Sequence, residues 1–249
     1  MRPKISIIMP NFNGEKYIKA TIQSVLNQTF KQWELIIVDD NSNVETLNIL
    51  KGIKKTKKIK IIYLRKNRGA AYCRNLAVKY TSGKYLAFLD SDDLWNKKKL
   101  AIQYEFMEKN KFFFTYTNYE LINHNNKNLG FVSPPKKFTF ETFVKNTSIG
   151  TSTMMIRKSI AKNIIFTSTP ICEDYFYKCK ILRKIDSAKL INSVLTKYRI
   201  RKNSLQSNKL RNVYWIWKIN NRYNKFNFFK NFKSLFFISL NSLIKYGFK

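Results

Sequence analysis

The sequence contains few acidic residues, few cysteines and a single histidine. The shortage of cysteine and histidine argues against disulfide-stabilised and zinc-binding proteins. Its 249 residues include 15 Asp or Glu against 47 Lys or Arg, a formal net charge of +32. Three scattered cysteines and one histidine are too few to predict a disulfide framework or a zinc site. No apolar run reaches the roughly 18 residues that span a bilayer, and no signal-peptide segment precedes the first predicted strand. We therefore expect a cytoplasmic protein, and any membrane contact should be peripheral.

The excess of positive charge is strongest toward the end of the sequence. Residues 187–249 contain 14 Lys or Arg and no Asp or Glu. Such a balance is typical of proteins that bind nucleic acid or an anionic membrane surface. Lys, Asn and Ile are abundant throughout, so part of the charge can also reflect an AT-rich gene. A nucleic-acid-binding protein is therefore one interpretation, although no recognised binding motif supports it.

Apolar runs alternate with segments of helical periodicity along the first hundred residues. Strands are predicted at 5–9, 33–38, 61–64 and 85–89, with helices at about 15–26, 44–53 and 70–80 between them. This alternation predicts an α/β fold whose mainly parallel sheet is flanked by helices. The first turn lacks the G-x-G-x-x-G pattern of the dinucleotide-binding version of this fold. Ligands of such sheets bind beyond the carboxyl ends of the strands, where Pro10, Asn11 and Asp39 fall.

Three carboxylates stand at the end of the last of these strands. Asp90, Asp92 and Asp93 follow the apolar run 85–89 within four positions. Clustered like charges repel and a buried carboxylate needs a partner, so we expect a cation to neutralise them. Hard oxygen ligands at the mouth of an α/β sheet suit Mg²⁺ or Mn²⁺, which also bind water and substrate phosphates. The alternative is a solvated acidic turn that caps the next helix.

Five ordered blocks carry a resemblance to a known family. They are Ile7–Gly14, Ser24–Phe30, Glu34–Ser42, Asn67–Gly69 with Arg74 and Asn75, and Leu89–Asp93. In this order and spacing the chain resembles the family 2 glycosyltransferases, whose N-terminal half is a GT-A nucleotide-sugar-binding fold. The resemblance is close over residues 4–100 and weaker over 150–207. It implies a GT-A domain at 1–207, with a nucleotide-sugar-binding half at 1–100 and an acceptor half at 101–207.

The resemblance also implies roles for the polar residues at the ligand-binding edge. Asp92 would bind the metal, Asp90 the metal, its water shell or the ribose, and Asp93 the donor or acceptor. Asp39 would read the nucleotide base, while Arg68 and Arg74 would lie near the diphosphate. Further nucleotide-sugar contacts are expected from Pro10, Asn11, Arg199 and Arg201. Many relatives carry His where this chain has Arg201. Arg201 could therefore make a cationic contact with phosphate or belong to a solvated basic loop. Unlike His, it would not titrate.

The second chemical motif is the pair Glu173-Asp174, at the start of a predicted aromatic helix. It resembles the Glu-Asp motif of the family, whose Asp removes a proton from the acceptor hydroxyl as it attacks the anomeric carbon. An alcohol is a poor nucleophile at neutral pH, so a base within hydrogen-bonding reach is needed. Asp174 is the predicted base, and Glu173 is the alternative. Two acids at a helix start could also simply interact favourably with the helix dipole.

The acceptor half is less regular. We predict a helix ending near Asn110, a strand at 112–116 and a loop over 123–137. Residues 151–156 resemble the strand on the acceptor side of the family. His124 lies in the predicted loop, and the sequence holds no second histidine. We therefore interpret His124 as an incidental loop residue and not as a metal ligand.

Residues 208–249 are predicted to form a basic, aromatic helical extension at the C-terminus. Eight residues make one mostly apolar stripe when written on a helix: Phe228, Phe229, Phe232, Leu235, Phe236, Ser239, Leu240 and Leu243. Aromatic residues mixed with cations favour a helix that lies in the headgroup region of an anionic membrane. The alternative is that the stripe packs on the domain as ordinary core.

Together with these features, the resemblance implies an inverting, metal-dependent glycosyltransferase. It would move a sugar from a nucleotide-sugar, with a UDP-sugar the expected donor, to a hydroxyl of a glycan or lipid-linked acceptor in surface polysaccharide synthesis. We expect Mn²⁺ or Mg²⁺ as cofactor, no specific nucleic acid as partner, and a cytoplasmic place at the inner face of an anionic membrane. The alternatives are a GT-A-like domain without activity and a basic protein that binds nucleic acid or membrane.

Overall fold

The first part of the chain forms a parallel α/β unit. The computed structural model describes residues 2–53, 56–201 and 209–246. The elements of this first part are β1 (Ile5–Asn11), α1 (Ile18–Leu26), β2 (Trp33–Asp39), α2 (Val44–Lys51), β3 (Ile59–Tyr63), α3 (Ala70–Lys79) and β4 (Tyr85–Phe88). Strands β3, β2, β1 and β4 lie side by side in that order and are parallel. The predicted alternation of strands and helices is confirmed.

The second part extends the same sheet with strands that pair largely antiparallel. Its elements are β5 (Leu94–Trp95), α4 (Lys99–Asn110), β6 (Phe114–Ile122), β7 (Asn128–Val132), β8 (Lys137–Phe138), α5 (Phe140–Phe143), the 3₁₀ turns η1 (Thr151–Thr153) and η2 (Lys158–Ala161), β9 (Met155–Arg157), α6 (Glu173–Leu182), β10 (Ala188–Arg199), α7 (Lys209–Arg222) and α8 (Phe228–Tyr246). The strand order is β3-β2-β1-β4-β9-β6-β10-β5, with β7 on β6 and β8 on β10. In this part β10 is parallel to β6, and the other pairings of described strands are antiparallel.

Two details of the second part differ from the sequence-based prediction. The segment 123–137, predicted as a loop, contains β7, which runs back along β6 after a turn in which Asn126 has φ 63°. Asn tolerates this left-handed conformation better than most residues do. The segment 151–156, predicted as a strand, begins with η1 and becomes extended at Met155. In both places composition alone could not show which neighbouring strand would supply backbone hydrogen bonds.

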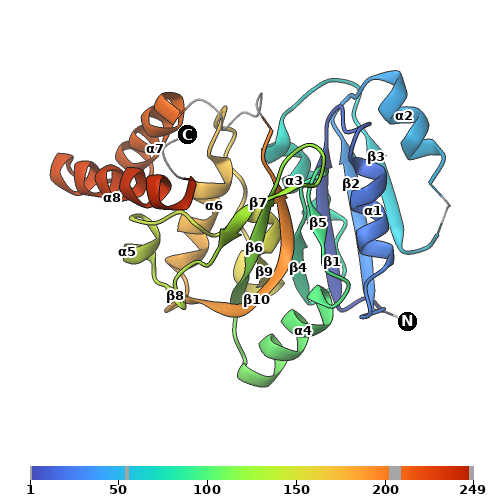
Figure 1. Cartoon of the computed structure of the whole chain (residues 1–249), viewed down its shortest axis with the longest axis horizontal. Helices are drawn as coiled ribbons and strands as arrows, with labels where there is room; N and C mark the ends of the chain where they lie inside the picture. The colour runs from blue at the N-terminus through green and yellow to red at the C-terminus, as the bar shows by residue number, and fades with distance from the viewer. Residues whose placement is uncertain (1, 54–55, 202–208, 247–249) are drawn as a thin grey trace.

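Alternate residues of the central strands feed two separate cores. Ile8 packs in a cluster that includes side chains of α3 and α6, whereas Ile7 and Met9 pack in a cluster that includes side chains of α1 and α4. Both faces of the sheet are therefore covered by helices (Figure 1). This explains why the central strands read as continuous apolar runs, and it leaves the strand ends as the place for polar residues.

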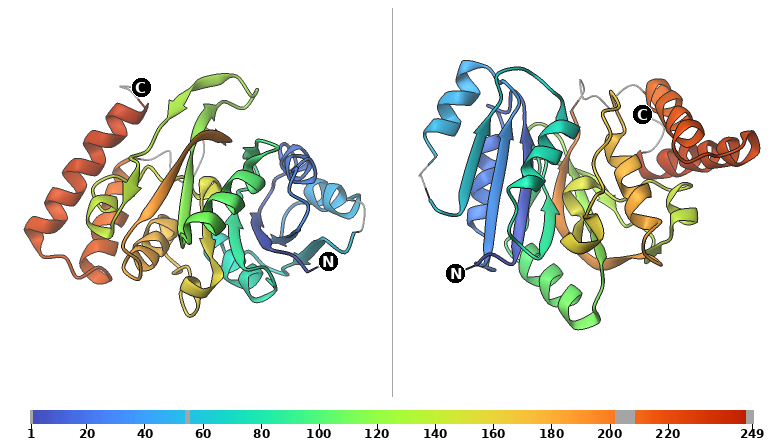
Figure 2. Two further views of the ribbon diagram at one scale, coloured as in Figure 1. Left: turned by 90° about the horizontal axis from the view of Figure 1, so that it is seen from below. Right: turned by 180° about the vertical axis from the view of Figure 1, so that it is seen from behind.

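Helices α7 and α8 make up the predicted C-terminal helical extension. They lie beside α5 and α6, at the end of the molecule away from α1 and α2 (Figures 1 and 2). The predicted domain boundary at 207 lies outside the described residues. None of the helices in the described ranges is long and apolar enough to cross a membrane.

Candidate active site

The carboxyl ends of the parallel strands bring the predicted polar residues to one edge of the sheet. Asn11 at the end of β1 lies opposite Asp39 at the end of β2, and Asp90 follows shortly after β4. Glu173 and Asp174 open α6, as predicted, and Glu173 is connected to Asp90 through Arg74. Residues from both halves of the chain therefore form one site.

Asp39 is fully buried beneath this edge. Its Oδ1 accepts hydrogen bonds from Asn11 Nδ2 at 2.7 Å and from Ser42 Oγ at 2.6 Å, and its Oδ2 accepts the Ser42 backbone N–H at 3.1 Å. Pro10 is buried in β1 beside Asn11. Both carboxylate oxygens thus hold the strand ends together, and the contact of Asp39 with a nucleotide base stays a prediction.

The neighbouring Asp40 shapes the loop that carries Arg68. Its two carboxylate oxygens accept the backbone N–H groups of Arg68 and Gly69, both at 2.7 Å. Gly69 has φ +83°, a conformation that favours glycine. Arg68 itself is exposed, with its guanidinium 4.5 Å from the centre of the Tyr72 ring. Asp40 therefore fixes the backbone of the loop and leaves the Arg68 side chain at the surface.

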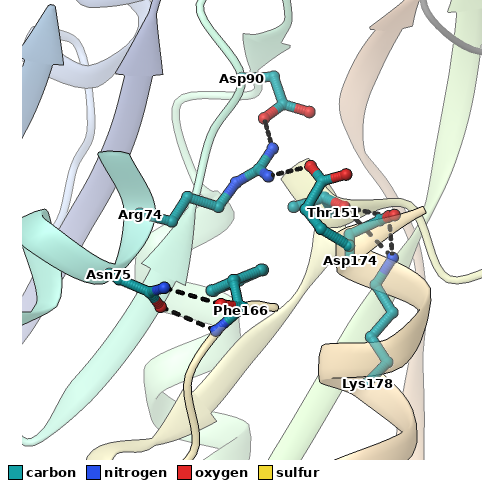
Figure 3. Close-up of polar contacts among 8 residues, drawn as sticks. Arg74, Asn75, Asp90, Thr151, Phe166, Asp174 and Lys178 are labelled. Carbon is teal, nitrogen blue, oxygen red and sulfur yellow. Dashed lines mark hydrogen bonds and ion pairs between the residues drawn. The ribbon is translucent and has the colours of Figure 1, made fainter. Parts of the chain in front are cut away.

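Arg74 connects the turn after β4 to the start of α6. Its guanidinium donates to Asp90 and to Glu173, each at 2.7 Å, and its side chain is only 6% exposed (Figure 3). The sequence-based expectation puts Arg74 near the donor diphosphate. In the structure two of its nitrogens are instead engaged by carboxylates of the chain. Because an ion pair this deeply buried is costly to break, Arg74 sets the spacing between the two acidic segments.

The acids that follow Asp90 face different partners. Asp92 pairs with Arg201 Nε at 2.8 Å, whereas Asp93 is buried and accepts the backbone N–H of Arg199 at 2.8 Å. Burial raises the pKa of both carboxyl groups above its ordinary value, and neighbouring carboxylates act in the same direction, against the pull of Arg201 on Asp92. Burial and mutual repulsion therefore both act against the charged form of these two carboxyl groups.

Asp90 and Asp92 are the residues that fit a divalent metal. Each has one carboxylate oxygen outside its ion pair, and their side chains are 28% and 16% exposed. Mg²⁺ and Mn²⁺ sites commonly use one or two carboxylates and are completed by water and substrate phosphates. Among the described residues, no three or more His, Cys, Asp or Glu side chains form a metal site. The two carboxylates thus suit a metal ion whose other ligands come from water and substrate phosphates.

Asp174 is held as an anion in the first turn of α6. Its Oδ2 accepts hydrogen bonds from Lys178 Nζ at 2.7 Å and from Thr151 Oγ1 at 2.8 Å (Figure 3). Lys178 lies one helical turn further along, and its side chain is 3% exposed. Burial acts to raise the pKa of Asp174, but Lys178, Arg74 and Thr151 together hold it below its ordinary value. The contacts leave Oδ1 of Asp174 for another ligand.

Glu173 has a different environment from its neighbour. It is paired with Arg74, and burial raises the pKa of its carboxyl group above the ordinary value. The structure thus separates the two acids of the motif by their partners, with Glu173 tied to Arg74 and Asp174 to Lys178.

The two arginines at the end of β10 also differ. Arg199 is buried, and its guanidinium donates to the carbonyls of Asp92 and Asn123 and to Asn126 Oδ1, at 2.7–2.8 Å. Arg201 is 48% exposed and pairs with Asp92. Arg199 therefore orders the chain around the acidic turn, while Arg201 is the residue of this pair that can reach a ligand. Tyr198–Ser204 resembles a family segment that closes over the donor diphosphate, and its residues 202–204 lie outside the described residues.

Three residues of this site were absent from the sequence-based prediction: Thr151, Ser152 and Lys178. Ser152 Oγ accepts the Asp90 backbone N–H at 3.0 Å, which fixes the start of the acidic turn. The i, i+4 spacing of Asp174 and Lys178 on a predicted helix was a signal that could have indicated their ion pair. No local pattern indicates Thr151 or Ser152, because their partners lie far away in the sequence.

Comparison with known proteins identifies the family. Residues 6–165 match the family model of Glycosyl transferase family 2. The chain is 36% identical over 231 residues, 92% of each chain, to the putative teichuronic acid biosynthesis glycosyltransferase TuaG of Bacillus subtilis (strain 168). It is 38% identical over 218 residues, 86% of this chain and 84% of the relative, to the UDP-Glc:alpha-D-GlcNAc-diphosphoundecaprenol beta-1,3-glucosyltransferase WfgD of Escherichia coli. The chain belongs to glycosyl transferase family 2.

Solved structures show the same fold. S. aureus TarS 1–349 in complex with UDP-GlcNAc matches with a TM-score of 0.74 at 21% identity, over 99% of this chain and 76% of that chain. The mannosyltransferase PcManGT from Pyrobaculum calidifontis, in complex with GDP-Man and Mn²⁺, matches with a TM-score of 0.71 at 15% identity, over 99% and 76%. The predicted GT-A fold is confirmed, and with the family match the protein is a glycosyltransferase.

Proposed function

We propose that this glycosyltransferase moves a sugar from a UDP-sugar to a hydroxyl of a lipid-linked glycan in surface polysaccharide synthesis, with inversion of the anomeric centre. The observation that carries the proposal is the connection of two acidic segments through Arg74, which pairs with Asp90 in one segment and with Glu173, the neighbour of Asp174, in the other. The name of the relative WfgD, which specifies a UDP-Glc donor and a diphosphoundecaprenol-linked acceptor, supports this choice of substrates.

Asp174 is the proposed base. The acceptor oxygen forms a bond to the anomeric carbon while the bond from that carbon to the donor diphosphate breaks, and the hydroxyl proton moves to Asp174. A single displacement on the face opposite the leaving group inverts the anomeric centre. Thr151 and Lys178 hold Oδ2 of the carboxylate, which keeps its orientation constant during the step.

Asp90 and Asp92 are the proposed ligands of Mn²⁺ or Mg²⁺. When bound, the metal would offset the negative charge that develops on the departing diphosphate. Among the described side chains, Arg68 and Arg201 are proposed to contact the phosphates, because both are exposed at the strand ends. Asp93 supports the acidic turn from inside the protein.

The proposed division of the chain follows the two halves of the site. Residues 1–100 bind the nucleotide-sugar, with Pro10, Asn11 and Asp39 on the nucleotide side, and residues 101–207 bind the acceptor. A lipid-linked acceptor cannot leave the bilayer, so the proposed place of action is the cytoplasmic face of the membrane.

A ligand screen tests this function. UDP-, GDP-, dTDP- and CDP-sugars are added with Mn²⁺, and both the melting temperature and sugar transfer are followed. We expect UDP-sugars to raise the melting temperature, since a ligand that binds only the folded state stabilises it, and chelation by EDTA to remove that effect. Stabilisation by none of the donors, together with salt-dependent binding of random DNA or RNA, would favour the nucleic-acid alternative instead.

The Lys178→Met variant is expected to move the acid limb of the kcat/KM profile to higher pH. Burial acts to raise the pKa of Asp174 and Lys178 acts against it, so that pKa rises when Lys178 is removed. The carboxylate form that accepts the proton is then lost at a higher pH as the solution is acidified. Lys178→Arg keeps the positive charge and should return the limb toward its wild-type position. With folding confirmed by circular dichroism, an acid limb that does not move in Lys178→Met would contradict this role.

A further inference from the structure

Helix α8 turns a side that includes Asn231 and Ser234 toward the protein. Asn231 Nδ2 donates to the Trp217 carbonyl of α7 at 3.1 Å, and Ser234 Oγ donates to the Val144 carbonyl at 2.5 Å. Asn231 and Ser234 are fully or almost fully buried, next to the buried Ile238. Hydrogen bonds to backbone carbonyls therefore dock this helix together with apolar contacts of Ile238 and Leu235.

The opposite side of α8 is aromatic and exposed. Five large apolar side chains, all members of the stripe predicted from the sequence, are 43–81% exposed: Phe228, Phe229, Phe232, Phe236 and Leu240. We call these five residues the aromatic row. Of the same stripe, Leu235 packs against the core. Packing on the domain, the alternative that the sequence left open, thus does not account for the aromatic row, and contiguous exposed apolar residues mark interaction surfaces.

Lysines flank the aromatic row. Lys230 and Lys233 are exposed on α8, and with Lys145 and Phe229 they line a groove of about 390 Å³ between α5 and α8. The acid in this groove, Glu141, is paired with Lys230 at 2.9 Å. Residues 208–249 contain nine Lys or Arg and no Asp or Glu. The groove beside the row therefore has three lysines against one acid.

We propose that the aromatic row and its flanking lysines form the surface by which the protein binds an anionic lipid bilayer. The Phe rings would enter the boundary between headgroups and acyl chains, while Lys233 meets the lipid phosphates beside the Lys230–Glu141 pair. Burying the row in this boundary removes its apolar surface from water, and the anionic leaflet offsets the positive charge beside it.

A second copy of this chain is the other candidate partner for the aromatic row. A symmetric dimer pairs the same surface from both subunits. It would bring two acid-free tails, each with nine Lys or Arg, against one another, and like charges brought close together repel. Charge complementarity therefore favours the bilayer.

The membrane-binding surface is connected to the proposed base. Tyr175 follows Asp174 in α6, and its hydroxyl donates to Asn220 Oδ1 of α7 at 2.7 Å. Asn220 Nδ2 in turn donates to Ser234 Oγ of α8 at 3.0 Å. The three helices lie together in the fold (Figures 1 and 2). Binding through α8 would thus fix the position of Asp174 relative to the bilayer, an advantage that rests on the proposed lipid-linked acceptor.

Co-sedimentation of the full chain with vesicles tests the surface. Vesicles of phosphatidylcholine alone are compared with vesicles that also contain phosphatidylglycerol, without donor or acceptor. We expect the wild type to bind the anionic vesicles, less as salt is raised. The triple variant Phe229→Ser, Phe232→Ser, Phe236→Ser should bind about tenfold or more weakly. Phe131→Ser is the matched control, since Phe131 is 65% exposed on β7, and it should bind as the wild type does.

Three outcomes would overturn the proposal. The triple variant could pellet as well as the wild type, or neither could pellet with anionic vesicles. The third is a wild-type dimer that becomes monomeric in the triple variant in sedimentation velocity without vesicle binding, which would assign the row to a second copy. Because vesicle binding is measured without substrates, its result is independent of whether sugar transfer is observed.

Discussion

Replacing Asp174 with Asn is expected to lower kcat by about 10²–10⁴-fold while UDP-sugar affinity stays near that of the wild type. Asn has almost the same shape as Asp and can still accept a hydrogen bond from Thr151, but it cannot take the acceptor proton. The ion pair with Lys178 is also lost, so the melting temperature is measured alongside turnover. Steady-state kinetics and isothermal titration with donor separate the chemical step from binding.

Two further variants make the result on Asp174 specific. Asp186→Asn changes an exposed acid between α6 and β10, outside the site, and should leave turnover unchanged. Glu173→Gln should be less damaging than Asp174→Asn if the base is assigned correctly. A larger loss in Glu173→Gln would exchange the two roles, and full activity in both variants would place the base elsewhere.

The Asp92→Ala variant is expected to lose Mn²⁺-dependent binding of UDP and, with it, sugar transfer. Asp92 has a carboxylate oxygen outside its ion pair with Arg201, and its removal leaves Asp90 as the remaining proposed ligand. Without the metal, the diphosphate loses much of the positive charge that it needs. Isothermal titration with UDP, in the presence of Mn²⁺ and in the presence of EDTA, measures this dependence directly.

Asp186→Ala serves as the matched control for the removal of a carboxylate and should keep the metal dependence. Arg201 is released from its partner in Asp92→Ala, so some metal-independent attraction for phosphate is expected to persist. An unchanged Mn²⁺-dependent affinity in Asp92→Ala would show that Asp92 is not a metal ligand.

The sequence predicted the first part of the fold well because its signals are local. The runs that became β1 and β2 are apolar on both faces, as buried parallel strands require, and the polar residues stand where these strands end. Asp39 and Asp90 thus reached the same edge simply through parallel pairing. The same reasoning could not assign their partners, which depend on side-chain packing.

Contacts between distant parts of the sequence account for most of what could not be predicted. Arg74 joins Asp90 and Glu173, which lie 16 and 99 residues further along, so no local pattern shows that it is buried between them. Composition likewise could not show that residues 128–132 find a partner in β6.

The side of α8 that contacts the protein also could not be predicted from the sequence. Helical periodicity identified the apolar stripe of α8, but periodicity does not say which side of a helix the protein covers. That choice depends on Asn231 and Ser234 meeting backbone carbonyls of α7 and of the segment after α5. The side with Asn231, Ser234 and Ile238 contacts the protein, and the aromatic row is exposed.

The central claim, an inverting transfer from a UDP-sugar, is tested most directly by the anomeric configuration of the product. The purified full chain is incubated with an α-linked UDP-sugar, Mn²⁺ and a lipid-diphosphate-linked glycan acceptor, and the new linkage is determined by proton NMR. A single displacement with Asp174 as the base predicts a β-linked product. An α-linked product would contradict that mechanism.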